Sequence, residues 1–376
     1  MKIRIERDVL AEAVAWAART LPSRPSLPVL SGLVLAAETD GLTVSSFDYD
    51  VSARVEVSAT ITEPGTTLVS GRLLADIARS LPAQPVTLET QGSRVAISCG
   101  RASFTLPTLP VEEYPQLPVM PASSGTIPGA NLAAAVAQVA IAAGRDDTLP
   151  TLTGIRMEIE GASLVLAATD RYRLAVRELT WAPESASVSA SALVLARTLA
   201  ETAKSLAGAD VVHIALGSQS GAEGLMGFEG AGRRSTTRLL DGEFPKYRSL
   251  LPNEIATAAR VETAFLAEAV KRVSLVAERN TPVRLAFAQE EVVLRAGAGE
   301  DAQASEAVEC AMQGDPIEIA FNPTYLLDGL AAVDAPLTHF AFTQPTRPAV
   351  LVGLAEVSDD PSDAYRYLLM PVRLTG

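Results

Sequence analysis

The sequence repeats itself, and this repeat limits the folds that the chain can adopt. The pentapeptide LAEAV at Leu10 recurs as LAAAV at Leu132 and as LAEAV at Leu266. The hexapeptide LPVLSG at Leu27 recurs as LPTLTG at Leu149, at the same offset of 122 residues as the first two pentapeptides. Because each copy is about the size of an ordinary domain, the pattern indicates tandem copies of one folded unit. We therefore expect three domains, and we place them at 1–122, 123–252 and 253–376.

A second repeat, later in each copy, divides the copy into halves. RLLADIARSL at 72–81 resembles RTLAETAKSL at 197–206, and a third version begins at Thr324. In the first copy the spacing of apolar residues predicts helices at 10–21 and 72–81. The strands predicted there are 2–6, 33–37, 42–47, 51–57, 67–70, 86–89, 94–99 and 102–106. Each copy is thus predicted to be two β-α-β-β-β halves, an α+β fold with helices on one face of antiparallel sheet.

Composition excludes several kinds of chemistry. Cys99 and Cys310 form no Cys-x-x-Cys pair, and His213 and His339 are isolated, so we interpret all four as packing or surface residues. There is no P-loop and no nucleophile elbow. The acidic pairs at 146–147 and 359–360 lie in loop-like contexts, where solvated carboxylates are favoured over a metal site. We therefore expect a non-enzymatic protein without metal or cofactor.

No segment suggests a membrane or an export route. The N-terminus has no apolar signal core, and the longest alanine-rich run, 132–143, is too short to span a bilayer. We expect a soluble, cytoplasmic protein.

The net charge of −13 argues at first against a nucleic-acid partner, but the charge is unevenly distributed. The three copies carry −3, −1 and −9, so the acid is concentrated in the third. Basic residues recur on the later helix of the first two copies, two turns apart on one face. A solvated helix face would explain any one pair, but the recurrence favours a basic track that contacts the duplex DNA backbone without reading sequence. The proposed track is Arg24, Arg72, Arg79, Arg197 and Lys204.

The densest polar cluster is the segment TDRYR, from Thr169 to Arg173. It has no supporting His or Cys, so we interpret it as structural or ligand-binding. An unidentified enzyme that uses this cluster is kept as an alternative, as is a repeat scaffold that binds protein peptides without encircling DNA.

Four segments carry a family resemblance. They are RPSLPVL at 24–30, ATDRYRL at 168–174, FNPTYLLD at 321–328 and YLLMPVRL at 367–374. With the three copies, they resemble the bacterial DNA polymerase III β subunits, the sliding clamps, over the whole chain. The excess of Arg over Lys is typical of a GC-rich genome, and with the resemblance it indicates an actinobacterial source.

The resemblance implies a processivity factor that is not an enzyme. Its fold would be a closed ring, a head-to-tail homodimer of six domains whose helices line a hole for duplex DNA. Across the dimer seam, Phe104 and Leu106 of the first domain would meet Leu275 of the third.

The resemblance also implies a peptide pocket between the second and third domains. It would receive a short Gln/Leu/Phe-containing motif from the replicative polymerase, the clamp loader and repair or translesion polymerases. An apolar floor with a few polar groups suits such a ligand. The implied pocket residues are Leu152, Thr169, Arg171, Tyr172, Arg173, Leu174, Pro245, Ser249, Leu250, Asn322, Tyr325, Met370, Pro371, Val372, Arg373 and Leu374. Many relatives have Gly-His in place of Arg171-Tyr172 and Arg in place of Ser249.

Overall fold

The computed structural model describes residues 1–39, 41–217, 224–252, 254–277, 281–297 and 302–373. They form two compact units. One unit comprises Met1–Ala133, Ala182–Ser185 and Glu201–Leu239, and the other comprises Ala134–Trp181, Ala186–Ala200 and Leu240–Gly376. The second sequence repeat contributes to both units. Of this repeat, residues 123–133, 182–185 and 201–239 lie in the first unit, and residues 134–181, 186–200 and 240–252 lie in the second.

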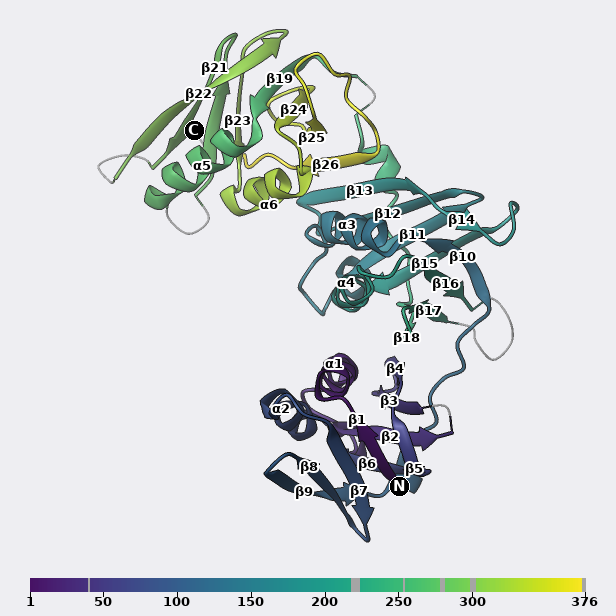
Figure 1. Cartoon of the computed structure of the whole chain (residues 1–376). Coiled ribbons are helices and arrows are strands. Elements are labelled where there is room, and N and C mark those ends of the chain that lie inside the picture. The colour runs from purple at the N-terminus through teal and green to yellow at the C-terminus, as the bar shows by residue number, and fades with distance from the viewer. Residues whose placement is uncertain (40, 218–223, 253, 278–280, 298–301, 374–376) are drawn as a thin grey trace. The chain divides into compact units, whose positions relative to one another are not determined.

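The first repeat contains two helices and nine strands among its described residues (Figure 1). The helices are α1 (Arg7–Ala17) and α2 (Gly71–Ser80). The strands are β1 (Lys2–Ile5), β2 (Gly32–Glu38), β3 (Gly41–Phe47), β4 (Val51–Val57), β5 (Thr60–Glu63), β6 (Gly65–Ser70), β7 (Val86–Gln91), β8 (Arg94–Cys99) and β9 (Ala102–Leu109). The elements predicted from the sequence are confirmed within a few residues. The strand β5 was missed, because its four residues alternate too briefly to give a pattern.

The second repeat follows the same order of elements, and the third follows it without a separate counterpart of β5 among its described residues. In the second repeat the helices are α3 (Gly129–Ala140) and α4 (Ala196–Ser205), and the strands are β10 (Ser123–Ile127), β11 (Gly154–Glu160), β12 (Ser163–Thr169), β13 (Arg173–Thr180), β14 (Ala182–Pro183), β15 (Ser189–Leu195), β16 (Val212–Leu216), β17 (Leu225–Gly230) and β18 (Arg233–Arg238). In the third the helices are α5 (Thr263–Val273) and α6 (Pro323–Val333), and the strands are β19 (Thr257–Glu262), β20 (Val283–Phe287), β21 (Glu291–Ala296), β22 (Ala304–Gln313), β23 (Ile317–Phe321), β24 (Leu337–Phe342), β25 (Ala349–Leu354) and β26 (Tyr365–Leu369).

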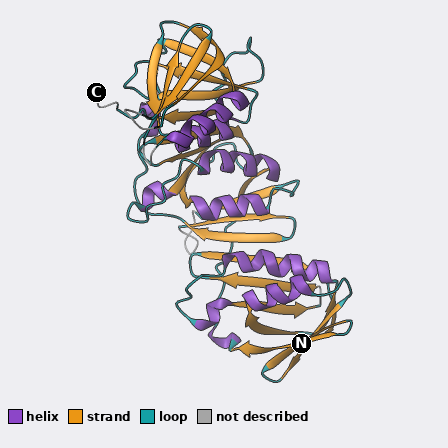
Figure 2. Cartoon of the chain, turned by 90° about the vertical axis from the view of Figure 1, so that its left-hand side faces the viewer, coloured by secondary structure: helices purple, strands orange, loops and turns teal. Residues whose placement is uncertain are grey.

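The repeated pentapeptide marks the core-facing side of the first helix in each repeat. Leu10 in α1, Leu132 in α3 and Leu266 in α5 are all 0% exposed, and the valine four residues after each is also fully buried. Burying one leucine side chain stabilises a fold by about 2 kcal/mol. In each compact unit the helices form a layer on one face of the sheets (Figure 2). The repeat is therefore a packing signal.

In every repeat, the two halves exchange their first strands. In the first repeat, β1 pairs with β7 of the second half, and β6 pairs with β2 of the first half. The same exchange pairs β10 with β16 and β15 with β11, and then β19 with β24 and β23 with β20. Because each half completes the sheet of the other, neither half has a finished sheet of its own.

Successive repeats are joined by antiparallel backbone pairing. The strand β4 pairs with β18 from Val51↔Thr237 to Val55↔Arg233, and this pairing extends one sheet to 14 strands. The strand β13 pairs with β26 from Arg173↔Leu369 to Arg177↔Tyr365, within a sheet of 12 strands. At both joints, the last strand of one repeat's first half pairs with the last strand of the next repeat's second half.

Candidate binding sites

The Thr169–Arg173 cluster forms a tight turn between β12 and β13. The carboxylate Oδ1 of Asp170 accepts hydrogen bonds from the backbone N–H groups of Tyr172 and Arg173, both at 3.0 Å. The Thr169 hydroxyl donates to the Arg173 carbonyl at 2.7 Å. Arg171 has φ 79°, a left-handed conformation that costs a residue with a Cβ about 1–2 kcal/mol.

The same turn occurs in the first repeat, where its aspartate, Asp48, lies 122 residues before Asp170. Asp48 accepts from the backbone N–H groups of Asp50 and Val51, and Tyr49 has φ 78°. Because the turn recurs in both repeats, it is part of the fold. Its aspartate has a structural role that does not depend on a ligand. What differs between the two turns is the set of side chains that follow the aspartate.

Arg173 connects this turn to helix α6. Its side chain is only 5% exposed; Nε donates to Asp170 Oδ2 at 2.9 Å and Nη1 donates to Asp328 Oδ2 at 2.5 Å. Its guanidinium carbon lies 4.3 Å from the centre of the Tyr325 ring. Burial lowers the pKa of Arg173. The hydrogen bond to Asp328, together with the interactions with Tyr367 and Asp170, raises the pKa by more, so the net shift is upward. Arg173 is therefore a fixed cation.

Two tyrosines form an aromatic surface beside this cation. The rings of Tyr172 and Tyr325 are stacked, with centres 6.2 Å apart and planes inclined by 26°. Tyr172 is the exposed member of the pair, at 56%. Tyr325 is more buried, and this burial raises the pKa of its hydroxyl. The Tyr367 hydroxyl donates to the Tyr325 carbonyl at 2.8 Å, and Asn322 caps the N-terminus of α6 through its side-chain oxygen. These contacts hold Tyr325 in place.

The turn and α6 enclose a cavity of about 520 Å³. Five of the implied pocket residues line it: Leu152, Arg171, Tyr172, Arg173 and Tyr325. Eight further residues, not predicted from the sequence as pocket residues, also line the cavity: Ala143, Gly144, Arg145, Asp146, Leu149, Asp170, Thr324 and Asp328. The offset of 122 residues between Asp48 and Asp170 was a signal for Asp170, whereas nothing local indicated Asp328.

The remaining implied pocket residues lie on four segments outside the lining of this cavity. Met370 follows β26 and donates its backbone N–H to the Tyr172 carbonyl at 2.9 Å, so the chain after β26 lies against the turn. Leu174 is 1% exposed and packs in a cluster with Tyr247 and Leu368. The others described are Thr169 and Asn322, discussed above, the exposed Pro245, Ser249 and Leu250, and the C-terminal Pro371, Val372 and Arg373. Leu374 lies outside the described residues.

Tyr247 holds the exposed segment that carries Ser249 and Leu250. It is 3% exposed, and its hydroxyl donates to Glu158 Oε2 of β11 at 2.9 Å. Arg248 pairs with the same carboxylate oxygen at 2.6 Å. The short 3-10 helix Tyr247–Leu250 is thereby fixed to the sheet.

The basic residues predicted to contact DNA are all exposed. Arg24 lies in the loop after α1, Arg72 and Arg79 lie on α2, and Arg197 and Lys204 lie on α4. Arg72 Nη2 donates to the Pro22 carbonyl at 3.1 Å, which brings α2 beside the loop that carries Arg24.

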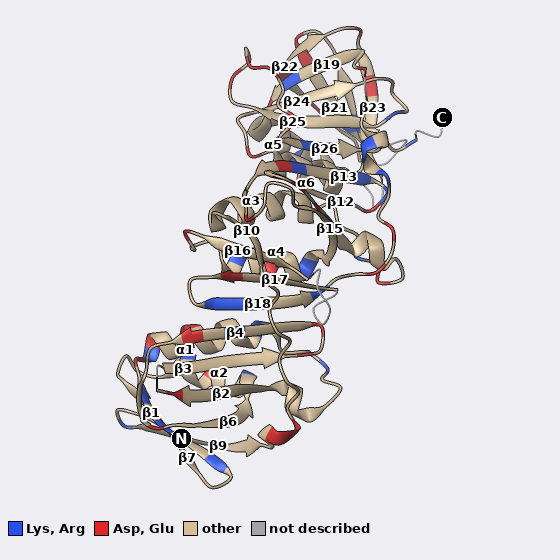
Figure 3. Cartoon of the chain, turned by 90° about the vertical axis from the view of Figure 1, so that its right-hand side faces the viewer, with Lys and Arg blue, Asp and Glu red and all other residues tan. Residues whose placement is uncertain are grey.

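Two arginines of the strand β18 form closer ion pairs than the basic residues of α2 and α4 do. The strand β18 carries several arginines (Figure 3), but Arg233 pairs with Glu12 and Arg234 pairs with Glu229. Within the described chain, Arg197 and Lys204 have no carboxylate within 4 Å, and Arg79 has only an exposed one at 3.8 Å. The cations of α2 and α4 therefore remain available for phosphate.

The three residues implied at the dimer seam differ in their exposure. Leu275 is 84% exposed, and Phe104 is partly buried. Leu106 is 1% exposed and packs in the core of the first repeat, so its side chain offers almost no surface for the expected contact with Leu275. The reason is the alternation along β9, which turns Ser103, Thr105 and Pro107 outward instead.

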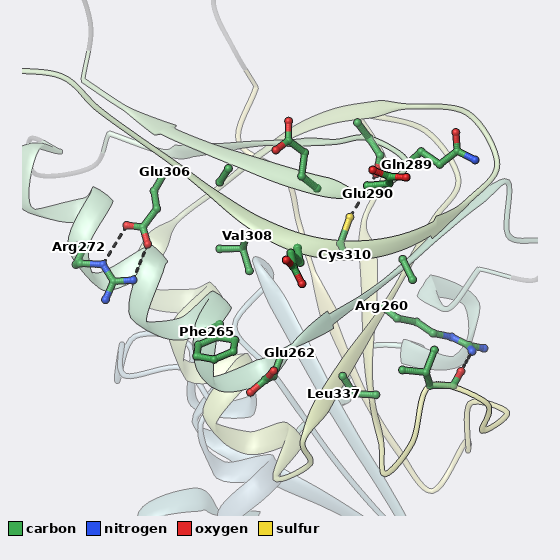
Figure 4. A pocket seen from close by; sticks show the side chains of 16 residues that line it. Arg260, Glu262, Phe265, Arg272, Gln289, Glu290, Glu306, Val308, Cys310 and Leu337 are labelled. Carbon is green, nitrogen blue, oxygen red and sulfur yellow. Dashed lines mark hydrogen bonds and ion pairs between the residues drawn. The ribbon is translucent and has the colours of Figure 1, made fainter.

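A groove of about 1240 Å³ lies along β22 and α5 (Figure 4). Phe265, 62% exposed, projects from α5, and Val308 and Cys310 line the groove from β22. Arg272 donates to Glu306 through two nitrogens, at 3.0 and 2.5 Å, and this hydrogen bond lowers the pKa of Glu306. The groove lining carries five glutamates and two arginines, so it is acidic and has apolar side chains within it.

The described residues contain no group of three or more His, Cys, Asp or Glu side chains that could hold a metal ion. None of the helices in the described chain is long and apolar enough to cross a membrane.

The fold and these sites define a three-repeat α+β protein with surfaces for binding. Three family models match it in order: the N-terminal domain of the DNA polymerase III beta subunit at residues 1–118, the central domain at 126–246 and the C-terminal domain at 248–373. The chain is 61% identical to the beta sliding clamp of Streptomyces coelicolor over 376 residues, which covers 100% of both chains. It is 47% identical to the beta sliding clamp homolog GriR of Streptomyces muensis, over 99% of each.

Solved structures agree with these matches. The sliding clamp of Bacillus subtilis superposes with a TM-score of 0.91 at 29% identity, covering 100% of this chain and 99% of that one. The Pseudomonas aeruginosa clamp bound to griselimycin superposes with a TM-score of 0.91 at 27% identity, covering 100% of both chains.

The chain belongs to the DNA polymerase III beta subunit family, the bacterial beta sliding clamps. It is a DNA sliding clamp, a non-enzymatic processivity factor of DNA replication, and the enzyme alternative for the Thr169–Arg173 cluster is set aside. The similarity to the Streptomyces clamp is consistent with an actinobacterial source.

We predict that Arg173→Met lowers the free energy of unfolding by about 3 kcal/mol, because it leaves Asp170 and Asp328 without their shared cation. Urea denaturation followed by circular dichroism measures this. The control is Lys271→Met, which removes an exposed helical pair with Glu268 and should cost less than about 0.5 kcal/mol. Equal losses in the two variants would contradict the role assigned to Arg173.

Proposed function

We propose that two copies of this chain close head to tail into a ring that encircles duplex DNA. The ring is proposed to slide without reading sequence and to tether the replicative polymerase, the clamp loader and repair or translesion polymerases. The domains are proposed to be 1–122, 123–252 and 253–376, and the protein to act in the cytoplasm. Family membership supports the general function, and the unpaired edges of β9 and β22 support the closed dimer.

Two strand edges support ring closure. Among the described strands, β9 pairs over residues 102–107 only with β8, and β22 pairs over residues 304–309 only with β21. By position, β22 is the last strand of the third repeat's first half, and β9 is the last strand of the first repeat's second half. These are the two strand types that pair at both joints within the chain. A β22–β9 pairing between two copies would repeat the same joint, and two such pairings would close six domains into a ring.

The surfaces beside these edges are complementary. The groove along β22 carries an excess of glutamates, and the hairpin between β8 and β9 carries the exposed Arg94 and Arg101. Exposed Phe265 and Leu275 offer apolar contact to the partly buried Phe104. An interface with an apolar centre and complementary charge at its margin is typical of stable association.

The exposed helix cations support a duplex DNA partner. Arg24, Arg72, Arg79, Arg197 and Lys204 are proposed to contact phosphates, which supply affinity without base readout. A ring retains DNA by enclosing it, so a few weak contacts suffice and leave the clamp free to slide.

The cavity beside Arg171 supports the proposed peptide site. The site would include the cavity-lining residues and the neighbouring segment from Met370, whose backbone lies against the turn. The Pseudomonas aeruginosa clamp was solved bound to griselimycin, so a clamp of this fold holds a ligand. We propose that partners of this chain place a short apolar motif in the cavity and its surroundings.

We predict that Leu275→Asp converts the dimer to a monomer at micromolar concentration, because it places a charge in an apolar contact. Sedimentation equilibrium measures the mass, and thermal unfolding checks that the protomer stays folded. The control is Val119→Asp, since Val119 is also 84% exposed but lies on the segment between β9 and β10. A wild-type chain that is monomeric would instead support the scaffold alternative, which binds partners without encircling DNA.

We predict that Arg24→Glu, Arg72→Glu and Arg197→Glu together shorten retention on nicked circular DNA, and that this deficit relative to the wild type shrinks as the salt concentration rises. Each phosphate contact contributes about 0.9 to the logarithmic salt dependence of affinity, so the slope should fall by about 3. The control reverses Arg4, Arg54 and Arg347, which are exposed and lie outside the helices, with the same change in net charge. Equal retention in the two triple variants would contradict the basic track.

A further inference from the structure

The two joints between repeats have the same backbone pairing but different side-chain chemistry. At the first joint, between β4 and β18, Ser52 lies opposite Thr236. At the second joint, between β13 and β26, Leu174 lies opposite Leu368. Leu174 follows Ser52 by the repeat offset of 122 residues, and each joint consists of five residue pairs in the same order. The two pairs therefore occupy equivalent positions.

Hydroxyl side chains fill the buried positions of the first joint. Ser235, Thr236 and Thr237 of β18 are buried, and so is Ser52 of β4. The hydroxyl oxygens of Ser52 and Thr236 lie 2.6 Å apart, and the Ser235 hydroxyl donates to the Ser52 carbonyl at 3.0 Å. These strands thus meet through a small network of hydrogen-bonded hydroxyls.

Large side chains occupy the equivalent positions at the second joint. Those of β26 are Tyr367, Leu368 and Leu369, and all three are buried. Leu174 and Leu368 belong to an apolar cluster whose members come from both sides of the joint, and Tyr247 packs into it from the segment after β18. Separating β13 from β26 would therefore expose several apolar side chains to water.

The two joints should resist separation unequally. A hydroxyl that loses its partner when strands separate gains another from water, so its hydrogen bond contributes only a small net stabilisation. A buried leucine has no such replacement, because its transfer to water is unfavourable. Since both joints have the same number of paired residues, the side chains decide which one is weaker.

Further side-chain contacts across the first joint are also polar. Arg233 of β18 pairs with Glu12 of α1, and Arg238 donates from Nε to the Tyr49 carbonyl at 2.8 Å. Glu12 and Arg238 are exposed, so water competes for both contacts and they add little to the strength of the joint.

We propose that the first joint is the compliant joint of the chain: it opens before the second joint, and it bends when the ring opens. The second part rests on the proposed ring. A closed ring of rigid domains can part at one seam only if another joint bends. Compliant joints belong to the least stable parts of a fold, and the hydroxyl-lined joint meets this condition.

The order of opening is tested by hydrogen–deuterium exchange on the full-length protein in rising, sub-denaturing urea. The paired amides of 51–55 and 233–237 should open at least about tenfold more often than those of 173–177 and 365–369, because burying one leucine already shifts an equilibrium by about that factor or more. Equal or stronger protection at the first joint would overturn the proposal.

Exchanging the side-chain chemistry tests its cause. Ser52→Ala with Thr236→Val replaces both hydroxyls by apolar groups of similar shape and should raise protection of the first joint several-fold. Val176→Thr places a hydroxyl in the apolar cluster and should lower protection of the second joint. The matched control is Thr263→Ala with Thr338→Val, which removes a hydroxyl pair 2.9 Å apart within the third repeat and should leave the first joint unchanged. Wild-type protection of the first joint in Ser52→Ala with Thr236→Val would contradict the role of the hydroxyls.

Retention on nicked circular DNA tests the role in ring opening. The Ser52→Ala, Thr236→Val variant should remain on the circles several-fold longer than the wild type, because a stiffer first joint makes parting of a seam rarer. An equal or shorter lifetime would overturn that role. A wild type that is monomeric, or that leaves circular and linear DNA equally fast, would instead refute the proposed ring. The exchange measurement on the same chain would still decide which joint opens first.

Discussion

Unpaired backbone groups at strand edges are the constraint on which the rest of this structure depends. Every strand edge must find hydrogen-bond partners, remain in water or pair with another chain. In this chain most edges are paired by the same two arrangements in each repeat. The first strand of each half pairs with the other half, and the last strands of a repeat pair with strands of the neighbouring repeats. Two joints are completed within the chain, and the edges of β9 and β22 remain for a third. The proposed ring is the closed form of the same pairing rule.

The positions of the unpaired basic residues are related to this arrangement of helices and strands. Some strand cations pair with acidic neighbours across the sheet, as Arg234 does with Glu229. The helices cover one face of the sheets, and among the described residues Arg72 of α2 and Arg197 and Lys204 of α4 have no carboxylate within 4 Å. A net charge of −13 is therefore compatible with a DNA partner, since the distribution of charge matters more than its sum.

The sequence predicted those parts of the fold that local patterns encode. The buried Leu10, Leu132 and Leu266 recur because each helix packs in the same way, so the repeat count and the element order followed from spacing alone. The exchange of first strands could not be predicted, because pairing partners leave no trace in a local alternation. The burial of Leu106 was not foreseen for a related reason: the resemblance identified the strand but not which of its side chains turn inward.

The candidate site divides in the same way. The Thr169–Arg173 turn was visible as a polar cluster, and its aspartate was visible as a repeated position. The partnership of Arg173 with Asp328 was not, because 155 residues separate them and only the fold brings them together. Likewise, the part of the cavity lined by Arg145 and Arg171 combines two loops whose proximity depends on how β11, β12 and β13 are paired.

Hydrogen–deuterium exchange on the intact dimer tests the central claim, the β22–β9 joint, most directly. The account predicts that outward-facing amides within 102–107 and 304–309 are protected in the wild type and exchange rapidly in a folded monomeric variant. Protection of both segments together would match the pairing seen at β4–β18 and β13–β26. Rapid exchange of either segment in a stable dimer would contradict the account, because the two chains would then be held together by some other surface.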